Sequence, residues 1–218
     1  KKPPFKQLRA KEGQLRKFYT LKIRLPRLYK KYASQPVQEN KVVFMEVRLP
    51  QLTNSLSLIY EEMKADGRYE IHQHFLQNTF VRRSEYDRRS REFIKDIATA
   101  KYVFVCEASN VLGCIAKRPE TIVTQTWHGC GAFKKFGMST AELIFGLNRE
   151  QMLRYPFYTN YTHVTLSSPD IAWAYEEAMN LSEQKEVIKP VGISRTDVFF
   201  DRKFIDRAYE NVYNKMPQ

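Results

Sequence analysis

From Lys41 onward, short runs of apolar and β-branched residues alternate with stretches in which apolar residues recur every three to four positions. The short runs predict six strands, and the periodic stretches between them predict helices. The predicted strands are Val42–Val47, Glu70–Leu76, Tyr102–Glu107, Thr121–Trp127, His163–Ser167 and Val187–Val191. The predicted helices are Leu52–Ala65, Glu85–Ala98, Asn110–Ala116, Thr140–Leu147, Pro169–Met179 and Phe204–Lys215.

This alternation predicts an α/β fold. Strands that are separated by helices are joined by right-handed crossovers, which give a mainly parallel, Rossmann-like sheet with helices on both faces. In such a sheet, ligands bind beyond the carboxyl ends of the strands. Three helix starts carry capping signals, which are Ser168 before Pro169, the capping box Ser139-x-x-Glu142, and the weaker pair Ser84-x-x-Asp87.

The first 35 residues follow a different pattern, because leucines and tyrosines at helical spacing are separated by lysines and arginines. The spacing predicts a helix over Gln14–Ala33, which Pro26 should kink or interrupt. Its apolar positions are Leu21, Leu25, Leu28, Tyr29 and Tyr32. We therefore expect a basic amphipathic arm or linker at residues 1–36, followed by a Rossmann-like domain at residues 37–218.

The arm and the domain also differ in net charge. The chain of 218 residues has 36 Lys and Arg against 24 Asp and Glu, a net charge of +12. Residues 1–35 hold twelve of the basic residues and one of the acidic ones, so the rest of the chain has 24 basic and 23 acidic residues. Such an arm suits an anionic membrane surface, where each Lys or Arg contributes roughly 1 kcal/mol. A linker helix packed on the body fits the same pattern.

Composition excludes several classes of protein. A chain with 43% hydrophobic residues is neither disordered nor of low complexity. No apolar run approaches the ~20 residues of a membrane span. The start at Lys1 has neither a methionine nor a signal-peptide core, so we expect a fragment of a longer protein. The three cysteines form no C-x-x-C pair, which argues against a disulfide framework and fits a reducing cytosolic setting.

One segment carries candidate chemistry at the end of a predicted strand. The run Thr121–Trp127 delivers His128 to the strand end, and Gly129 and Gly131 would let the backbone turn tightly. A histidine titrates near neutrality, as a general base should, while glycine-loop amides and the nearby Lys134 and Lys135 would form an anion site. From spacing alone, a histidine that ends a strand is more often a structural hydrogen-bonding residue than a catalytic base, so both roles stay open for His128.

These residues also form part of a longer motif, Trp-His-Gly-x-x-x-x-Lys-Lys-x-Gly, from Trp127 to Gly137. Further landmarks are Lys41-Val-Val-Phe44, Ser167-Ser-Pro-Asp170 and Gly192-Ile-Ser-Arg-Thr-Asp197. In these motifs the chain resembles the CDP-glycerol glycerophosphotransferases, which are teichoic acid polymerases and primases. One departure is Ser194, where that family usually has a proline.

The resemblance implies the N-terminal, acceptor-side half of a GT-B fold. It implies transfer of glycerol phosphate or ribitol phosphate from CDP-glycerol or CDP-ribitol to a teichoic acid or capsule-type polymer, releasing CMP. His128 would be the catalytic base. The residues implied in binding acceptor or phosphate are Gly129, Gly131, Lys134, Lys135, Ser168, Arg195 and Asp197. No metal and no cofactor are expected.

The resemblance also implies a location and a missing part. The enzyme would lie peripherally on the cytoplasmic face of the plasma membrane. The C-terminal domain that binds the CDP-polyol donor is expected to be absent from this chain, so the fragment alone should be inactive. Alternatives are a GT-B glycosyltransferase with a nucleotide-sugar donor, and a non-catalytic basic module that binds polyanions or membranes.

Other candidate sites are weaker. The sequence pI near 9.6 raises the possibility of nucleic-acid binding, but no RNA-recognition pattern, zinc-finger spacing or basic helix-turn-helix accompanies it, so no nucleic-acid partner is expected. His72 and His74 could share one strand face and bind a metal, or simply form a half-exposed face. Cys130 and His128 could form a nucleophile pair, although positions two apart on a loop rarely orient that way.

Overall fold

A computed structural model describes residues 4–144 and 146–216, with side chains from Leu8 onward. Six parallel strands form one sheet in the order β2-β1-β3-β4-β5-β6. The strands are β1 Gln38–Glu46, β2 Glu70–Phe75, β3 Ala100–Val105, β4 Ile122–Gln125, β5 His163–Thr165 and β6 Ile188–Lys189. All six predicted strands are confirmed, and so is the predicted α/β class with its parallel sheet.

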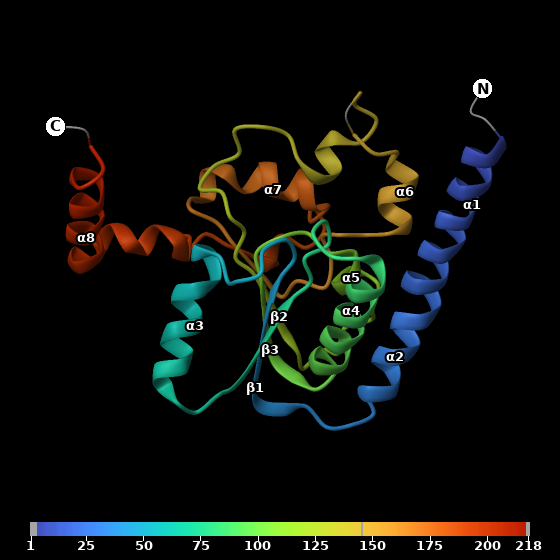
Figure 1. The fold of residues 1–218 in the computed structure, drawn as a ribbon, viewed down its shortest axis with the longest axis horizontal. Helices are drawn as coiled ribbons and strands as arrows, with labels where there is room; N and C mark the ends of the chain where they lie inside the picture. The colour runs from blue at the N-terminus through green and yellow to red at the C-terminus, as the bar shows by residue number, and fades with distance from the viewer. Residues whose placement is uncertain (1–3, 145, 217–218) are drawn as a thin grey trace.

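Helices connect the strands and flank the sheet (Figure 1). They are α1 Pro4–Phe18, α2 Leu25–Tyr32, α3 Asn54–Asp66, α4 Arg83–Ile97, α5 Asn110–Gly113, α6 Arg149–Arg154, α7 Ala172–Met179 and α8 Arg202–Tyr213. Short 3-10 turns occur at Gly137–Thr140, Pro169–Ile171, Lys185–Val187 and Ser194–Phe200. The strands run upward in Figure 1, so their carboxyl ends point to the side of the sheet on which α6 and α7 lie, and α1 reaches the same side at the right.

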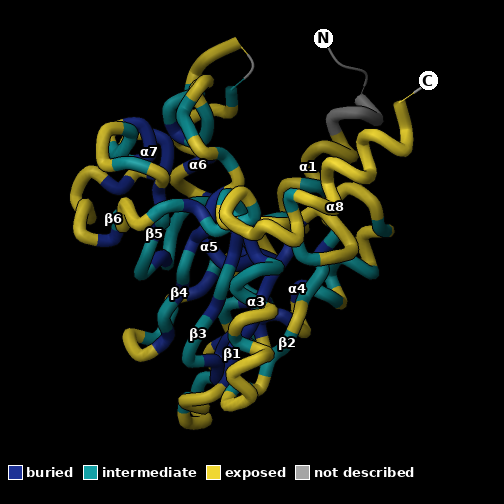
Figure 2. Tube along the Cα trace, turned by 90° about the vertical axis from the view of Figure 1, so that its left-hand side faces the viewer, coloured by how far each residue is buried: buried dark blue, intermediate teal, exposed yellow. Residues whose placement is uncertain are grey.

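The core follows from the two-residue period of the strands. One face of β1 presents Val43 and Met45, which pack with Phe93 and Ile94 of α4. The opposite face presents Val42 and Phe44 to the apolar side of α3. Because β1 is central, it is buried on both faces, which explains its continuous apolar run. Figure 2 shows this buried centre and the exposed helices α1 and α8 around it.

The arm is joined to this core through its second half. Leu21, Leu25 and Tyr29 are buried in the same cluster as the α4 side chains, and the Tyr29 hydroxyl accepts a hydrogen bond of 3.1 Å from the Arg118 amide. The helix is interrupted, as predicted, by a π-helical segment at Tyr19–Arg24. Pro26 lacks an N–H and crowds the preceding turn, and a widened turn relieves both problems.

The predicted helix Thr140–Leu147 is wrong, and so is its capping box. The Ser139 hydroxyl instead bonds the backbone of Phe136, closing a turn on its N-terminal side. Glu142 then has a φ of 64°, which ends helical geometry. The Glu142 carboxylate accepts from the Arg149 amide at 2.7 Å, and α6 begins there under an Asn148 cap.

The weaker capping signal Ser84-x-x-Asp87 is also wrong. Helix α4 begins at Arg83, and Arg82 stands at the N-cap position without a side-chain cap. The arginines that follow are paired within the helix. Arg88 bonds Glu85 and Glu92, so the cluster is a salt-bridged helix face. The Ser168 cap, in contrast, is confirmed, because its hydroxyl accepts from the Asp170 amide at 3.2 Å.

Candidate active site

The chain turns sharply where β4 ends, and Trp127 makes the turn. Its φ is 55°, in the left-handed region that non-glycine residues rarely occupy. The Trp127 indole is held against Phe136, with ring centroids 4.7 Å apart, and against the edge of Tyr175. The glycines with positive φ in the described chain are Gly67, Gly137 and Gly192. The left-handed turn is therefore made by Trp127, and neither Gly129 nor Gly131 has the positive φ that would require a glycine.

This turn presents His128 at the carboxyl end of the sheet, as the positional rule predicts. The ring stacks on Trp127 with centroids 4.3 Å apart, and the residue is exposed. Its Nδ1 lies 3.0 Å from the carbonyl oxygen of Cys106, at the end of β3. A carbonyl can only accept, so Nδ1 carries the proton and Nε2 of the neutral ring keeps a free lone pair.

The loop after His128 is anchored by donors from distant parts of the chain. The Arg195 guanidinium donates to the His128 carbonyl. The Ser167 hydroxyl donates to the Cys130 carbonyl, and the Tyr175 hydroxyl donates to Gly129 at 3.2 Å. His128 and Arg195, which are 67 positions apart in the sequence, thus bring their two motifs into direct contact. The three donors thus fix the backbone from His128 to Cys130.

The turn that carries Arg195 is fixed in the same way. Gly192 has a φ of 95°, which favours glycine, and the Ser194 hydroxyl donates to the Ser55 carbonyl at 2.6 Å. Ser194 therefore ties this turn to the first turn of α3. Asp197 is exposed and lines a hollow of about 310 Å³ with Thr126 and other side chains of β3 to β5.

The remaining predicted site residues lie near this loop without touching His128. Lys134 and Lys135 are exposed, and within the described chain neither forms an ion pair or side-chain hydrogen bond. The Ser168 hydroxyl is engaged in capping Asp170. The structure therefore brings His128, Gly129 and Arg195 together and leaves the lysine pair free in solvent.

Comparison with known proteins shows which family this chain belongs to. The sequence model of the family "CDP-Glycerol:Poly(glycerophosphate) glycerophosphotransferase" matches residues 28–217. The chain belongs to this family. It is 30% identical over 185 residues to a teichoic acid ribitol-phosphate primase of Bacillus spizizenii, covering 84% of this chain and 47% of the relative. It is 28% identical to the teichoic acid ribitol-phosphate polymerase TarL of Staphylococcus aureus, over 82% of this chain and 31% of the relative.

The fold is shared with solved structures of the wall teichoic acid polymerase TagF. One aligns with a TM-score of 0.65 at 19% identity, over 98% of this chain and 53% of that chain. A histidine variant of TagF soaked with CDPG aligns with a TM-score of 0.63 at 16% identity, over 100% of this chain and 57% of that chain. The chain therefore shares its α/β fold with the matched part of TagF, and it spans between 31% and 57% of the length of these relatives.

Two carboxylates near the ends of β1 and β3 are not among the site residues that the sequence predicts. Glu46 ends β1, is fully buried, and accepts from the Cys106 thiol at 3.3 Å. Glu107 follows β3, where burial and then the charge of Glu46 raise its pKa, while the charges of Arg48 and His128 oppose that rise. The signal that could have found them is a polar residue directly after a buried apolar run, at the strand ends where ligands bind.

The Cys106 thiol and the two histidines of β2 are engaged with carboxylates of the same chain. Burial, and then the charge of Glu46, raise the pKa of Cys106, which disfavours its thiolate form. His72 and His74 both bond the carboxylate of Asp96, at 3.2 and 2.8 Å. Among the described residues, no group of three histidine, cysteine, aspartate or glutamate side chains could hold a metal ion.

The structure also bears on membrane association. Within residues 4–144 and 146–216, no helix combines the length and apolar character that a membrane crossing requires.

Proposed function

We propose that this chain is the acceptor-side half of a CDP-polyol phosphotransferase that extends a teichoic acid or capsule-type polymer. The observation that carries the proposal is His128, exposed at the end of β4 with Nδ1 committed to the Cys106 carbonyl and Nε2 free. Family membership supports the reaction class. The curated relatives are named for ribitol phosphate, so CDP-ribitol is the first donor to test and CDP-glycerol the second.

In the proposed step, Nε2 of His128 takes the proton of a terminal hydroxyl on the polymer. The hydroxyl oxygen forms a bond to the β-phosphorus of the donor, and the bond from that phosphorus to the bridging oxygen breaks. CMP leaves with the electron pair, so no covalent intermediate with the protein is formed. A hydroxyl is a poor nucleophile at neutral pH, so a base that removes its proton during the attack accelerates the reaction.

The surrounding groups suit the charges that this step creates. The imidazolium that forms is favoured by the nearby Glu107 carboxylate, whose charge interacts with that of His128. We assign acceptor or phosphate binding to Lys134, Lys135 and the amides around Gly129 and Gly131, because the free lysines leave their charge available. Ser168, Arg195 and Asp197 lie on the segments that anchor or face the same loop.

The donor would bind in a second domain. The chain covers 47% of the ribitol-phosphate primase, which leaves room in such relatives for a donor-binding half. The isolated chain should therefore release no CMP from either donor. Measurable transfer by the isolated chain would show that the donor site lies within these 218 residues.

We further propose that the arm holds the enzyme at an anionic membrane on its cytoplasmic side. Helix α1 is exposed along Leu8 and Leu15 and belongs to the strongly basic segment. An exposed helix with apolar and basic side chains binds an anionic surface in the plane of the membrane.

The test of the catalytic proposal is CMP release from CDP-ribitol and CDP-glycerol, measured in a protein that joins this chain to its donor-binding half. His128→Ala should lower the rate by roughly 10²–10⁴-fold, the usual contribution of a general base. His163→Ala, at the start of β5, is the matched control and should keep the rate. A near-normal rate in the His128 variant would remove this residue from the mechanism, and turnover with a nucleotide-sugar donor alone would indicate a glycosyltransferase.

A further inference from the structure

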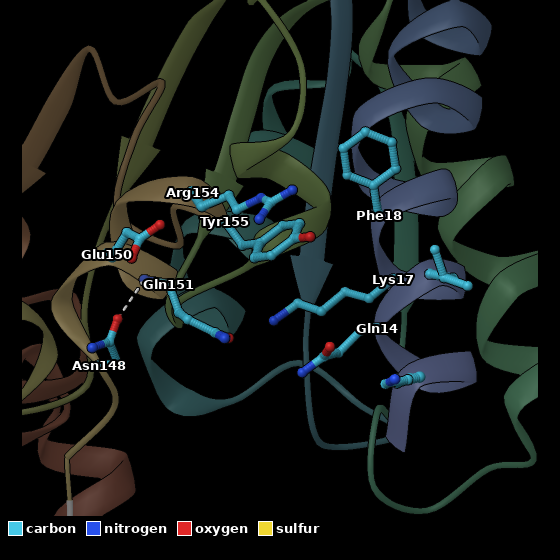
Figure 3. Close-up of a pocket in the computed structure, with 10 residues that line it drawn as sticks. Gln14, Lys17, Phe18, Asn148, Glu150, Gln151, Arg154 and Tyr155 are labelled. Carbon is cyan, nitrogen blue, oxygen red and sulfur yellow. Dashed lines mark hydrogen bonds between the residues drawn. The ribbon is translucent and has the colours of Figure 1, made fainter. Parts of the chain in front are cut away.

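A groove of about 740 Å³ separates α1 from α6 at the same end of the molecule as the carboxyl ends of the strands (Figures 1 and 3). Its α1 side carries Lys11, Gln14, Leu15, Lys17 and Phe18, and its α6 side carries Asn148, Glu150, Gln151, Arg154 and Tyr155. The transfer reaction proposed above uses none of these residues.

Positive charge converges on one aromatic ring in this groove. The Lys17 ammonium lies 4.4 Å from the centroid of the Tyr155 ring, and the Lys22 ammonium lies 5.7 Å from it. The Arg154 guanidinium is 5.7 Å from the same ring and 5.6 Å from that of Phe18. Figure 3 shows Lys17 reaching from α1 toward Tyr155 on the opposite wall.

These three cations contact aromatic rings but form no ion pair, unlike several basic residues elsewhere in the chain. Lys41, Arg88 and Arg89 all pair with carboxylates. Over the described part of the chain, Lys17, Lys22 and Arg154 form no ion pair, although the Glu150 carboxylate also lines the groove. Partial burial lowers the pKa of Lys17, so its charge is less well solvated than that of a free lysine.

Three cations gathered in a groove with a single carboxylate, Glu150, which pairs with none of them, repel one another, and a bound anion would relieve that repulsion. A guanidinium and an ammonium match the oxygens of a phosphate, and the amides of Gln14 and Gln151 supply further donors. Leu15 and Phe18 give the α1 wall an apolar strip beside these groups. The groove therefore offers polar contacts for a phosphate and apolar contacts for the carbon chain next to it.

We propose that the α1–α6 groove is a second anion site, which binds the phosphodiester of a glycerol phosphate or a similar polyol phosphate. This chemistry occurs both in a phospholipid headgroup and in a soluble unit of a polyol-phosphate polymer. Either source would place the phosphodiester at the same end of the sheet as His128. The site is separate from the transfer step, because among the described residues no hydrogen bond, ion pair or ring contact joins the groove to the His128 loop.

The test measures binding, so its failure would leave the proposed transfer reaction untouched. The full chain is titrated at low salt with glycerophosphoglycerol, a soluble phosphodiester, and separately with vesicles of phosphatidylglycerol in phosphatidylcholine. Lys17→Gln and Arg154→Gln should each weaken binding of at least one probe by roughly tenfold, the effect of one charge-assisted contact.

The control removes a similar contact on the far side of the molecule. Lys64 lies 5.6 Å above the ring of Tyr60 on α3, so Lys64→Gln loses one charge and one cation–aromatic contact without touching the groove. Loss of glycerophosphoglycerol binding in the groove variants identifies a soluble ligand, and loss of vesicle binding alone identifies a lipid headgroup. If neither probe binds, or if Lys64→Gln weakens binding as much as Lys17→Gln, the proposal is wrong.

Discussion

At the scale of single residues, the orientation of His128 depends on the conformation of its neighbour. Trp127 holds a left-handed backbone, which costs an L-residue about 1–2 kcal/mol. The indole compensates because it is 7% exposed and packs against three aromatic rings in addition to His128. Strain of this kind persists only where the surroundings fix it, and here it aims the His128 ring out of the sheet.

Glycine is required at position 137, the last position of the motif, both because of its backbone conformation and because a side chain would have no room there. Its φ is 55°, and a Cβ there would lie 2.2 Å from the Ala178 carbonyl oxygen on α7. Gly137→Ala should therefore lower the free energy of unfolding by about 3 kcal/mol, from left-handed strain together with the clash. Thermal and urea unfolding measure this.

Gly129→Ala is the matched control within the same loop. Gly129 has no positive φ, and its nearest neighbour to a new Cβ is the Gly131 carbonyl oxygen at 3.5 Å, an ordinary contact. This variant should change stability by less than about 1 kcal/mol. Equal losses in the two variants would show that φ and the approach of α7 are not what selects glycine at position 137.

At the scale of elements, one carboxylate joins two strands and a helix. Asp96 of α4 accepts from Lys41 of β1 at 2.8 Å, and from His72 and His74 of β2. Burial alone would raise the pKa of Asp96, but the hydrogen bonds of His74 and Lys41 and the charges of Lys41 and His72 hold it well below its ordinary value. The network therefore fixes α4 against the edge of the sheet that is farthest from His128.

This pairing predicts how stability depends on pH. A carboxyl whose pKa is lower in the folded state contributes stability above its unfolded pKa, near 4, and loses it as pH falls through the folded value. Asp96→Asn should lower the free energy of unfolding by about 2 kcal/mol at neutral pH, and should flatten the fall in stability below about pH 4.

Asp66→Asn provides the control for this measurement. Asp66 also has a lowered pKa, chiefly through its hydrogen bond with Arg68, but the pair lies at the surface. Solvent screens such pairs, so the variant should unfold much as the parent does. A parent-like acid transition in Asp96→Asn would show that this network does not govern acid unfolding.

At the scale of the whole molecule, the basic arm has two halves with different roles. Leu25 is fully buried and Tyr29 nearly so, in the same cluster as the α4 core. Leu15, one helix earlier, is 70% exposed, and the walls of the α1–α6 groove begin there. The second half is therefore part of the folded body, whereas α1 extends along the strand-end edge.

Paired leucine substitutions test this division. Leu25→Ala removes a fully buried side chain and should cost about 3 kcal/mol of stability, whereas Leu15→Ala should stay within about 0.5 kcal/mol. Chemical denaturation of both variants gives the comparison. Similar small effects at the two positions would mean that α2 is not packed as the structure shows.

Truncations extend the same test to membrane binding. Removal of residues 1–18 should leave the body folded and abolish binding to anionic vesicles, because it deletes α1 and spares Leu21, Leu25 and Tyr29. Removal of residues 1–35 should also destabilise the body, since it strips these three side chains from the core. Vesicle co-sedimentation and circular dichroism separate the effects, and full vesicle binding by the shorter truncation would remove α1 from membrane attachment.

Much of the architecture could be predicted because its causes are local. Two-residue and 3.6-residue periods report which side of a segment is buried, and all six strands were placed by them. The predicted helix Thr140–Leu147 is wrong because the apolar residues of this segment have helical spacing, but hydrogen bonds with neighbouring segments determine its backbone conformation. Glu142 is drawn to the Arg149 amide, and the Ser139 hydroxyl is used by Phe136. Capping motifs read alone do not show that competition.

Local patterns are enough to predict the succession of strands and helices, a histidine at a strand end and the motifs of the family. The folded chain is needed to show that the Cys106 carbonyl fixes the His128 tautomer, that Arg195 anchors the His128 carbonyl and that α2 belongs to the core. Periodicity fixes which face of an element is apolar, but hydrogen bonds between strand ends depend on how the sheet brings distant residues together.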